Sequence, residues 1–332
     1  MRQAMARAPL GDDGFGEDPS VNKLEEVAAH RLRKEAALFI SSGTMGNLLG
    51  MLVNSARSDE VIADAASHIF LSEGAGAAGI ANVQIRQIVT DDGVITPQQV
   101  HAAVRNPAPM TQPRTAALAI ENTHNRHEGL AWPIAALSAV TAAARDERLA
   151  IHMDGARLFN AAIAIGVDAS EIVGCADTVT FCLSKGLSCP VGSLFLGTRE
   201  KVQIARRWRR RLGGGMRQAG VMAAAGLYAL ANMVDRLSED HSNARTLAEG
   251  LAEIKGLTVR ERLHRTNIVF AEIRAMPAQE FIEDCAHLGL RVLDAGGNRV
   301  RLVTHYGVTS RDVQKALSIV SSVLRGRIPA AS

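Results

Sequence analysis

The chain has 332 residues, enough for one large domain and a smaller one, and its 47% hydrophobic and 21% charged residues are typical of a globular protein rather than a disordered one. A formal net charge of +3 is too small to indicate general nucleic-acid binding. No apolar run approaches the roughly 20 residues of a membrane span, and the N-terminus has no signal-peptide pattern, so we expect a cytoplasmic protein. Four cysteines without a CxxC pair predict a reducing compartment, with thiols used as small core residues.

From residue 36 onward, apolar runs of strand length alternate with stretches of helical period. The predicted strands are 36–40, 61–63, 83–89, 116–120, 149–153, 178–183 and 191–196. The predicted helices are 45–54, a segment starting near residue 65, 97–104 after Thr96 as N-cap, and 133–145. Unbroken apolar strands that alternate with helices indicate an α/β protein with a largely parallel sheet covered on both faces.

The pattern changes after about residue 232, where the charge pattern predicts a long exposed helix over 232–255. The rest of the chain predicts strands at 258–262, 267–272, 291–293 and 299–304, and helices at 279–288 and 310–325. We therefore expect a large domain over 1–238 and a small α+β domain over 239–332.

Sites in open α/β sheets gather at the carboxyl ends of the strands. The polar segments in such positions are SGT (42–44), ENTH (121–124), DGAR (154–157) and SKG (184–186). A lone lysine such as Lys185 is more often solvated, but a buried lysine tends to lose its charge. A neutral amine can form a Schiff base with an aldehyde, so both interpretations remain open.

Asp154 follows a predicted strand and could either cap a helix or keep a pyridine nitrogen protonated. The stretch SSGTMGN (41–47) opens a helix whose free N–H groups could bind a phosphate, although it lacks the Walker pattern. His68 and His124 could stack on a cofactor and exchange a proton with substrate, but each could equally be a polar loop residue.

The arginine run 206–211 favours a helix face, a subunit contact or a phosphate-facing patch over nucleic-acid binding. Arg301, on a predicted strand, could bind a carboxylate in bidentate fashion or be a solvated edge residue. A metal could be considered at one further group, but its spacing fits no specific site, and we expect no catalytic metal. That group consists of His124, His127, His152 and Asp154.

Together these stretches resemble the L-threonine aldolases of the low-specificity type, which belong to the aspartate-aminotransferase-like (fold type I) pyridoxal-phosphate enzymes. The resemblance rests on segments in the family's order: GDDGFGEDPSVNKLE (11–25), SSGTMGN, HIFLSEGAG, ENTHN, HMDGARLFNA, CLSKGLSCPVGS, RWRRRLGGGMRQAG and VRLVTH. It implies a large domain with a mostly parallel central sheet, a smaller C-terminal α+β domain and pyridoxal 5'-phosphate as cofactor.

The resemblance also implies roles at the cofactor. Lys185 would bond to it covalently, Asp154 would pair with its pyridine nitrogen, and His68 would stack on its ring. Gly43 and Thr44 would hold its phosphate.

For the substrate, the resemblance places Arg157 near the carboxylate and the cofactor's phenolic oxygen. His124 would approach the β-hydroxyl, and Arg301 would bind the α-carboxylate. Arg210 and Arg217 would reach a neighbouring subunit's phosphate in a homotetramer built as a dimer of dimers with its sites at the dimer interface.

The implied activity is cleavage of L-threonine or L-allo-threonine to glycine and acetaldehyde, in threonine catabolism and glycine biosynthesis. Alternatives are a phenylserine-type aldolase or a β-eliminating lyase on the same scaffold. A weakly active or non-catalytic relative is also an alternative, because the family's first strand, of the type DLRSDT, is missing and we expect the N-terminal segment to be truncated. Substrate preference, the identity of the base at the β-hydroxyl and the presence of a structural cation stay open.

Overall fold

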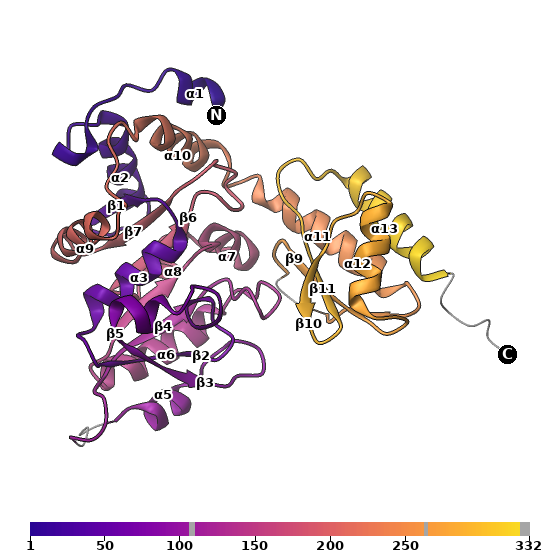
Figure 1. Ribbon diagram of the computed structural model, residues 1–332, viewed down its shortest axis with the longest axis horizontal. Coiled ribbons are helices and arrows are strands. Elements are labelled where there is room, and N and C mark those ends of the chain that lie inside the picture. The colour runs from indigo at the N-terminus through magenta and orange to yellow at the C-terminus, as the bar shows by residue number, and fades with distance from the viewer. Residues whose placement is uncertain (106–109, 262–264, 326–332) are drawn as a thin grey trace. The chain divides into compact units, whose positions relative to one another are not determined.

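The computed structural model describes residues 1–105, 110–261 and 265–325 (Figure 1). The chain divides into two compact units, Met1–Asp235 and Arg236–Ser332. Among the described helices, none combines the length and the apolar character that crossing a membrane requires.

A seven-stranded sheet forms the centre of the first unit, in the order β1-β7-β6-β5-β4-β2-β3. Its strands are β1 (Ala36–Ile40), β2 (Glu60–Asp64), β3 (Gln84–Ile88), β4 (Thr115–Glu121), β5 (Ala150–Asp154), β6 (Thr178–Cys182) and β7 (Ser193–Gly197). All neighbours from β6 to β3 pair in parallel, whereas β7 is antiparallel to both β6 and β1. Every residue of β2, β4 and β6 is buried, as their unbroken apolar runs predict.

Helices and short helical turns surround this sheet (Figure 1). They are α1 (Arg2–Ala6), η1 (Asp13–Phe15), α2 (Pro19–Arg31), α3 (Gly43–Asn54), α4 (His68–Leu71), η2 (Ala77–Ala81), α5 (Pro97–Ala103), α6 (Ile134–Asp146), α7 (Leu158–Ile165), α8 (Ala169–Val173), α9 (Arg199–Arg211) and α10 (Gly220–Asn232). Helix α3 is central to the site, because its apolar residues pack on β1 and β7 at one side and on β2 and β4 at the other.

The second unit holds an antiparallel four-stranded sheet in the order β10-β11-β9-β8. Its elements are α11 (Leu237–Ala252), β8 (Leu257–Thr258), β9 (Ile268–Ile273), α12 (Ala278–His287), β10 (Leu293–Gly296), β11 (Arg299–Val303) and α13 (Ser310–Arg325). Apolar residues of the three helices and of β9 and β11 form one core.

The structure confirms the predicted fold class, a mostly parallel sheet followed by a small α+β unit, but it corrects four elements. The helix expected over 232–255 is interrupted, since α10 ends at Asn232 and α11 begins at Leu237. The intervening turn begins with buried Met233 and Val234 and contains no glycine or proline that would mark the break. The strand expected over 258–262 is only Leu257–Thr258, and residue 262 lies outside the described residues.

The third correction concerns the segment after β2. A helix is expected near Ala65, but α4 begins only at His68. The reason is local: the Asp64 carboxylate accepts a hydrogen bond from the backbone N–H of Ala66 at 2.7 Å and holds the chain in a turn. Likewise, the strand expected over 291–293 begins only at Leu293 and continues to Gly296.

Candidate active site

Polar residues follow several neighbouring strands at the same edge of the large sheet. Because β2, β4, β5 and β6 are parallel, their carboxyl ends share this edge, and β1 joins them since it is antiparallel to β7, which is itself antiparallel to β6. The structure therefore brings together the start of α3, Asp64, Glu121, Asp154 and the loop that contains Lys185. This edge is where ligands bind in open α/β sheets.

Lys185 lies in the loop that leaves β6, and its side chain is half-buried. Within the described part of the chain, its amine makes no ion pair and no hydrogen bond, while its backbone carbonyl accepts one from the N–H of Ser188 at 2.9 Å. An amine without hydrogen-bond partners in the protein has no contact to break before it reacts covalently with a ligand.

Asp154, the last residue of β5, is 5% exposed and is held through both carboxylate oxygens. Its Oδ1 accepts the backbone N–H of Ala156 at 3.0 Å, and its Oδ2 accepts Nδ2 of Asn47 at 2.8 Å. Three residues further on, half-buried Arg157 donates from Nη1 to Oδ1 of Asn125 at 3.5 Å. The DGAR motif thus presents a fixed carboxylate and a guanidinium beside it.

His68 is fixed through its backbone and its ring. Its N–H donates to Oε2 of Glu121 at 2.6 Å, and its Nδ1 lies 2.7 Å from Oε1 of Glu73. The hydrogen bond to Glu73 raises the pKa of His68 above its ordinary value, while burial raises the pKa of the Glu73 carboxyl. The side chain of His68 remains 29% exposed, which leaves it able to contact a ligand.

Helix α3 begins directly behind β1 with the SGT turn. Ser42 caps it, since its Oγ accepts the backbone N–H of Met45 at 3.2 Å. Gly43 is required by a close approach: a Cβ at this position would lie 2.7 Å from Sγ of Cys182. The first N–H groups of a helix have no carbonyl one turn earlier, so those of Gly43 and Thr44 are suited to an anion.

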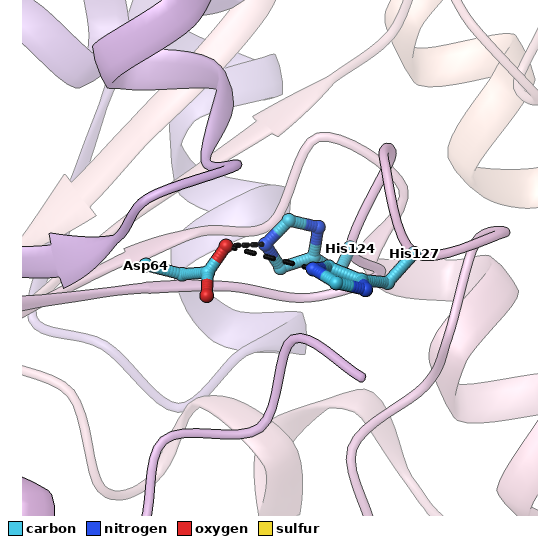
Figure 2. A group of neighbouring side chains, drawn as sticks. All are labelled: Asp64, His124 and His127. Atoms are coloured by element: carbon cyan, nitrogen blue, oxygen red, sulfur yellow. Dashed lines mark hydrogen bonds and ion pairs between the residues drawn. The ribbon is translucent and has the colours of Figure 1, made fainter. Parts of the chain in front are cut away.

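His124 belongs to a different cluster of side chains, which Figure 2 shows around Asp64. Its Nε2 lies 3.2 Å from Oδ1 of Asp64, and Nε2 of His127 lies 3.7 Å from the same oxygen. Burial opposes ionisation of Asp64, but hydrogen bonds from His124 and Thr90 and the nearby ring of His127 hold its pKa well below the usual range. Burial also disfavours a charged His124, yet Asp64 and the nearby Glu121 raise the pKa of this imidazole above its ordinary value.

Two groups of described residues hold potential metal-ligand atoms within 4.8 Å of one another. They are Asp64, His124 and His127, and His68, Glu73 and Asp154. The group considered from the sequence is not assembled, because the ring of His152 is hydrogen-bonded to Asn47 and Thr178.

The arginine run lies on α9 and serves several purposes. Arg209 is buried, donating to Oδ2 of Asp13 and to the carbonyl of Phe39, each at 2.7 Å. Arg210 and Arg217 are exposed, and Arg217 donates to Oδ2 of Asp12 at 2.8 Å.

Arg301 lies on β11 of the second unit, where it pairs with Leu293 and Phe270 across the sheet. Its expected role at the substrate carboxylate stays a prediction.

Sequence reasoning missed the residues that support the site. Asp64 ends β2 and could have been found by the strand-end rule that selects the other segments. Asn47 and Glu73 lie inside the quoted stretches SSGTMGN and HIFLSEGAG, but no spacing rule marks them, because their partners are distant in sequence.

Comparison with known proteins agrees with this geometry. Residues 1–275 match the family model of the β-eliminating lyases. The low specificity L-threonine aldolase of Escherichia coli (strain K12) is 42% identical, with 93% of this chain and 90% of that protein covered. Low-specificity L-threonine aldolase 1 of Arabidopsis thaliana is 38% identical, with 96% and 90% covered.

The fold is also that of a solved threonine aldolase. The Leishmania major enzyme superposes with a TM-score of 0.80 at 18% identity, covering 93% of this chain and 91% of that one. The chain belongs to the β-eliminating lyase family and, within it, to the family of the low-specificity L-threonine aldolases.

Proposed function

We propose that this protein is a pyridoxal-phosphate-dependent aldolase that cleaves L-threonine and L-allo-threonine to glycine and acetaldehyde. One observation carries the proposal: a lysine without a partner among the described residues and a buried carboxylate held through both oxygens share one sheet edge. They do so in a chain 38–42% identical to low-specificity L-threonine aldolases.

The residues present fit this cofactor. The amine of Lys185 is available to bond to an aldehyde, and the carboxylate of Asp154 can accept a hydrogen bond from a protonated ring nitrogen. Gly43 lets the start of α3 lie close to Cys182, and the first N–H groups of this helix are suited to a phosphate. The ring of His68 is exposed enough to stack on the cofactor. When bound, pyridoxal phosphate serves as the electron sink for the pair released when the Cα–Cβ bond breaks.

His124 is our candidate for the group that receives the β-hydroxyl proton. Its Nε2 faces Asp64, so a proton on Nε2 leaves Nδ1 with the lone pair, and Nδ1 is buried without a hydrogen bond to the described residues. The side chain is only 1% exposed, and we therefore expect the proton to pass through a water molecule.

Arg157 and Arg301 are proposed to bind the α-carboxylate, since a guanidinium matches a carboxylate with two parallel hydrogen bonds. Binding of the carboxylate would orient the Cα–Cβ bond of the substrate relative to the cofactor. We also propose a cytoplasmic homotetramer in which exposed Arg210 and Arg217 reach a neighbouring subunit's phosphate.

The test combines a spectrum with product analysis. Purified protein should show an absorbance band near roughly 420 nm that Lys185→Ala abolishes, while the exposed-lysine control Lys23→Ala retains it. L-threonine should yield equal amounts of glycine and acetaldehyde. A band that survives Lys185→Ala refutes the role of the lysine.

Formation of 2-oxobutanoate and ammonia from L-threonine would instead identify a β-eliminating lyase, and faster turnover of phenylserine to benzaldehyde an aromatic-type aldolase. A cofactor-bearing protein that acts on none of these substrates would be a non-catalytic relative.

A further inference from the structure

A row of buried polar side chains lies behind Asp154 and is not used by the proposed chemistry. Asn47 on α3, His152 on β5 and Thr178 on β6 are each at most 2% exposed. Nε2 of His152 lies 3.2 Å from Oδ1 of Asn47, and its Nδ1 lies 2.9 Å from Oγ1 of Thr178. The row therefore connects three elements of the large unit to the carboxylate of Asp154.

The direction of every hydrogen bond in this row follows from the chemistry at its first member. Nδ2 of Asn47 lies 2.8 Å from Oδ2 of Asp154 and 2.8 Å from Oε1 of Glu73, and carboxylate oxygens accept. The amide oxygen of Asn47 must therefore face His152, whose Nε2 carries the proton. Nδ1 of His152 then holds a lone pair and accepts the hydroxyl proton of Thr178.

The row continues to the surface of the unit with the same direction. The hydroxyl of Thr178, whose O–H donates to His152, accepts a hydrogen bond from Nδ2 of Asn54 at 2.7 Å. Oδ1 of Asn54 in turn accepts from Nζ of Lys201 at 2.6 Å. With the amide of Asn47 fixed by the two carboxylates, this assignment of donors and acceptors satisfies every hydrogen bond in the row.

Packing fixes the central imidazole in place. A Cβ at Gly50 would lie 2.4 Å from Cε1 and Nδ1 of His152, so only glycine allows α3 to lie this close to the ring. Burial lowers the pKa of His152 to about 4, which keeps the ring neutral with one donor and one acceptor.

We propose that Asn47, with His152 and Thr178 behind it, positions two groups assigned to the cofactor ring. It holds Asp154, assigned to the ring nitrogen, directly, and His68, assigned to the ring face, through Glu73. This inference rests on the proposed function, because that function assigns Asp154 and His68 to the cofactor. One N–H of Asn47 orients the carboxylate of Asp154, and the other orients the carboxylate that binds Nδ1 of His68. The remaining lone pairs of Asp154 are thereby aimed in a fixed direction.

The test uses two variants and a matched control. Asn47→Leu removes both N–H groups and the amide oxygen at similar volume, and Thr178→Val removes the hydroxyl that donates to His152 and accepts from Asn54. Thr141→Val is the control, since Thr141 is equally a buried threonine, but its hydroxyl donates to the carbonyl of Leu137 within α6.

Cofactor-free protein is titrated with pyridoxal phosphate, and absorbance gives the dissociation constant. We expect affinity to fall at least about tenfold in Asn47→Leu and about threefold in Thr178→Val, and to stay unchanged in Thr141→Val. With ¹⁵N-labelled cofactor, the ring nitrogen should lose its proton at lower pH in both row variants than in the control.

A second measurement needs no cofactor. The ¹⁵N shifts of the His152 ring should show a proton on Nε2 in the parent and a mixture of tautomers in Asn47→Leu, which lacks the amide oxygen that accepts from Nε2. A parent ring protonated on Nδ1 would overturn the row itself. Equal cofactor binding and equal ring-nitrogen titration in all four proteins would overturn the positioning role and leave the proposed function standing, whereas a parent that binds no cofactor would overturn both.

Discussion

Two neighbouring aspartates allow the energetic effect of burial to be measured with one type of substitution. Asp13 pairs with Arg209 at 2.7 Å, with side chains 1% and 5% exposed. Asp12 pairs with Arg217 at 2.8 Å, with side chains 21% and 59% exposed. Asparagine keeps one acceptor oxygen at either position, removes the negative charge and replaces the other oxygen with an NH2 group.

Asp13→Asn leaves a buried guanidinium without its counter-charge, a change that typically costs about 3–5 kcal/mol. Arg209 keeps the carbonyl of Phe39 as an acceptor, and the new amide oxygen can still accept, so we expect a loss of about 3 kcal/mol in the free energy of unfolding. Water and salt screen the exposed pair, and Asp12→Asn should cause a far smaller loss.

The chain supplies a selective probe for this experiment. Its two tryptophans, Trp132 and Trp208, both belong to the unit Met1–Asp235, so tryptophan fluorescence during urea unfolding follows the unit that contains both ion pairs. Equal losses for Asp12→Asn and Asp13→Asn, or a smaller loss for Asp13→Asn, would refute the argument from burial.

Three further predictions concern the site. Gly43→Ala should weaken pyridoxal phosphate binding about tenfold, because its Cβ would lie 2.7 Å from Sγ of Cys182. Adding Cys182→Ala to the same chain should restore most of the affinity, and a double variant that binds no better than Gly43→Ala would contradict the steric cause. Asp64→Asn should lower the pKa of His124, measured by NMR titration of its ring protons, since it removes the charge that raises this pKa; an unchanged midpoint would show that Asp64 is not the cause. His152 is protonated near its ordinary pKa of 6.5 in the unfolded chain but only at a pKa of about 4 in the folded protein, so acid destabilises the fold between these values. From about pH 7 to about pH 5 the free energy of unfolding of the parent should therefore fall by about 2 kcal/mol more than that of His152→Phe. Parallel pH profiles of tryptophan-detected unfolding in the two proteins would exclude this.

The sequence predicted the parts of this molecule that depend on local pattern. The apolar run of β4 and Thr96 as the N-cap of α5 are signals contained in a few adjacent residues, and the structure bears out both elements. The family was recognised because motifs around Lys185 and Asp154 are specific in their order and composition, and the comparisons confirm it.

What the sequence did not predict depends on contacts between distant segments. Asn47 meets Asp154 across 107 positions, and Asp64 meets His124 across 60. The burial of Arg209 was also not predictable, because a run of arginines normally marks a solvated helix face, and only the fold places Asp13 beside this one.

The single amide of Asn47 has a consequence for attempts to alter the enzyme. Because it holds Asp154 with one N–H and Glu73 with the other, a change made to retune one side of the cofactor pocket displaces the group on the other side. Libraries that randomise residues 68–73, which include His68 and Glu73, should therefore produce variants whose electronic and stacking properties shift together. Separating the two properties would require replacing Asn47 by two independent donors.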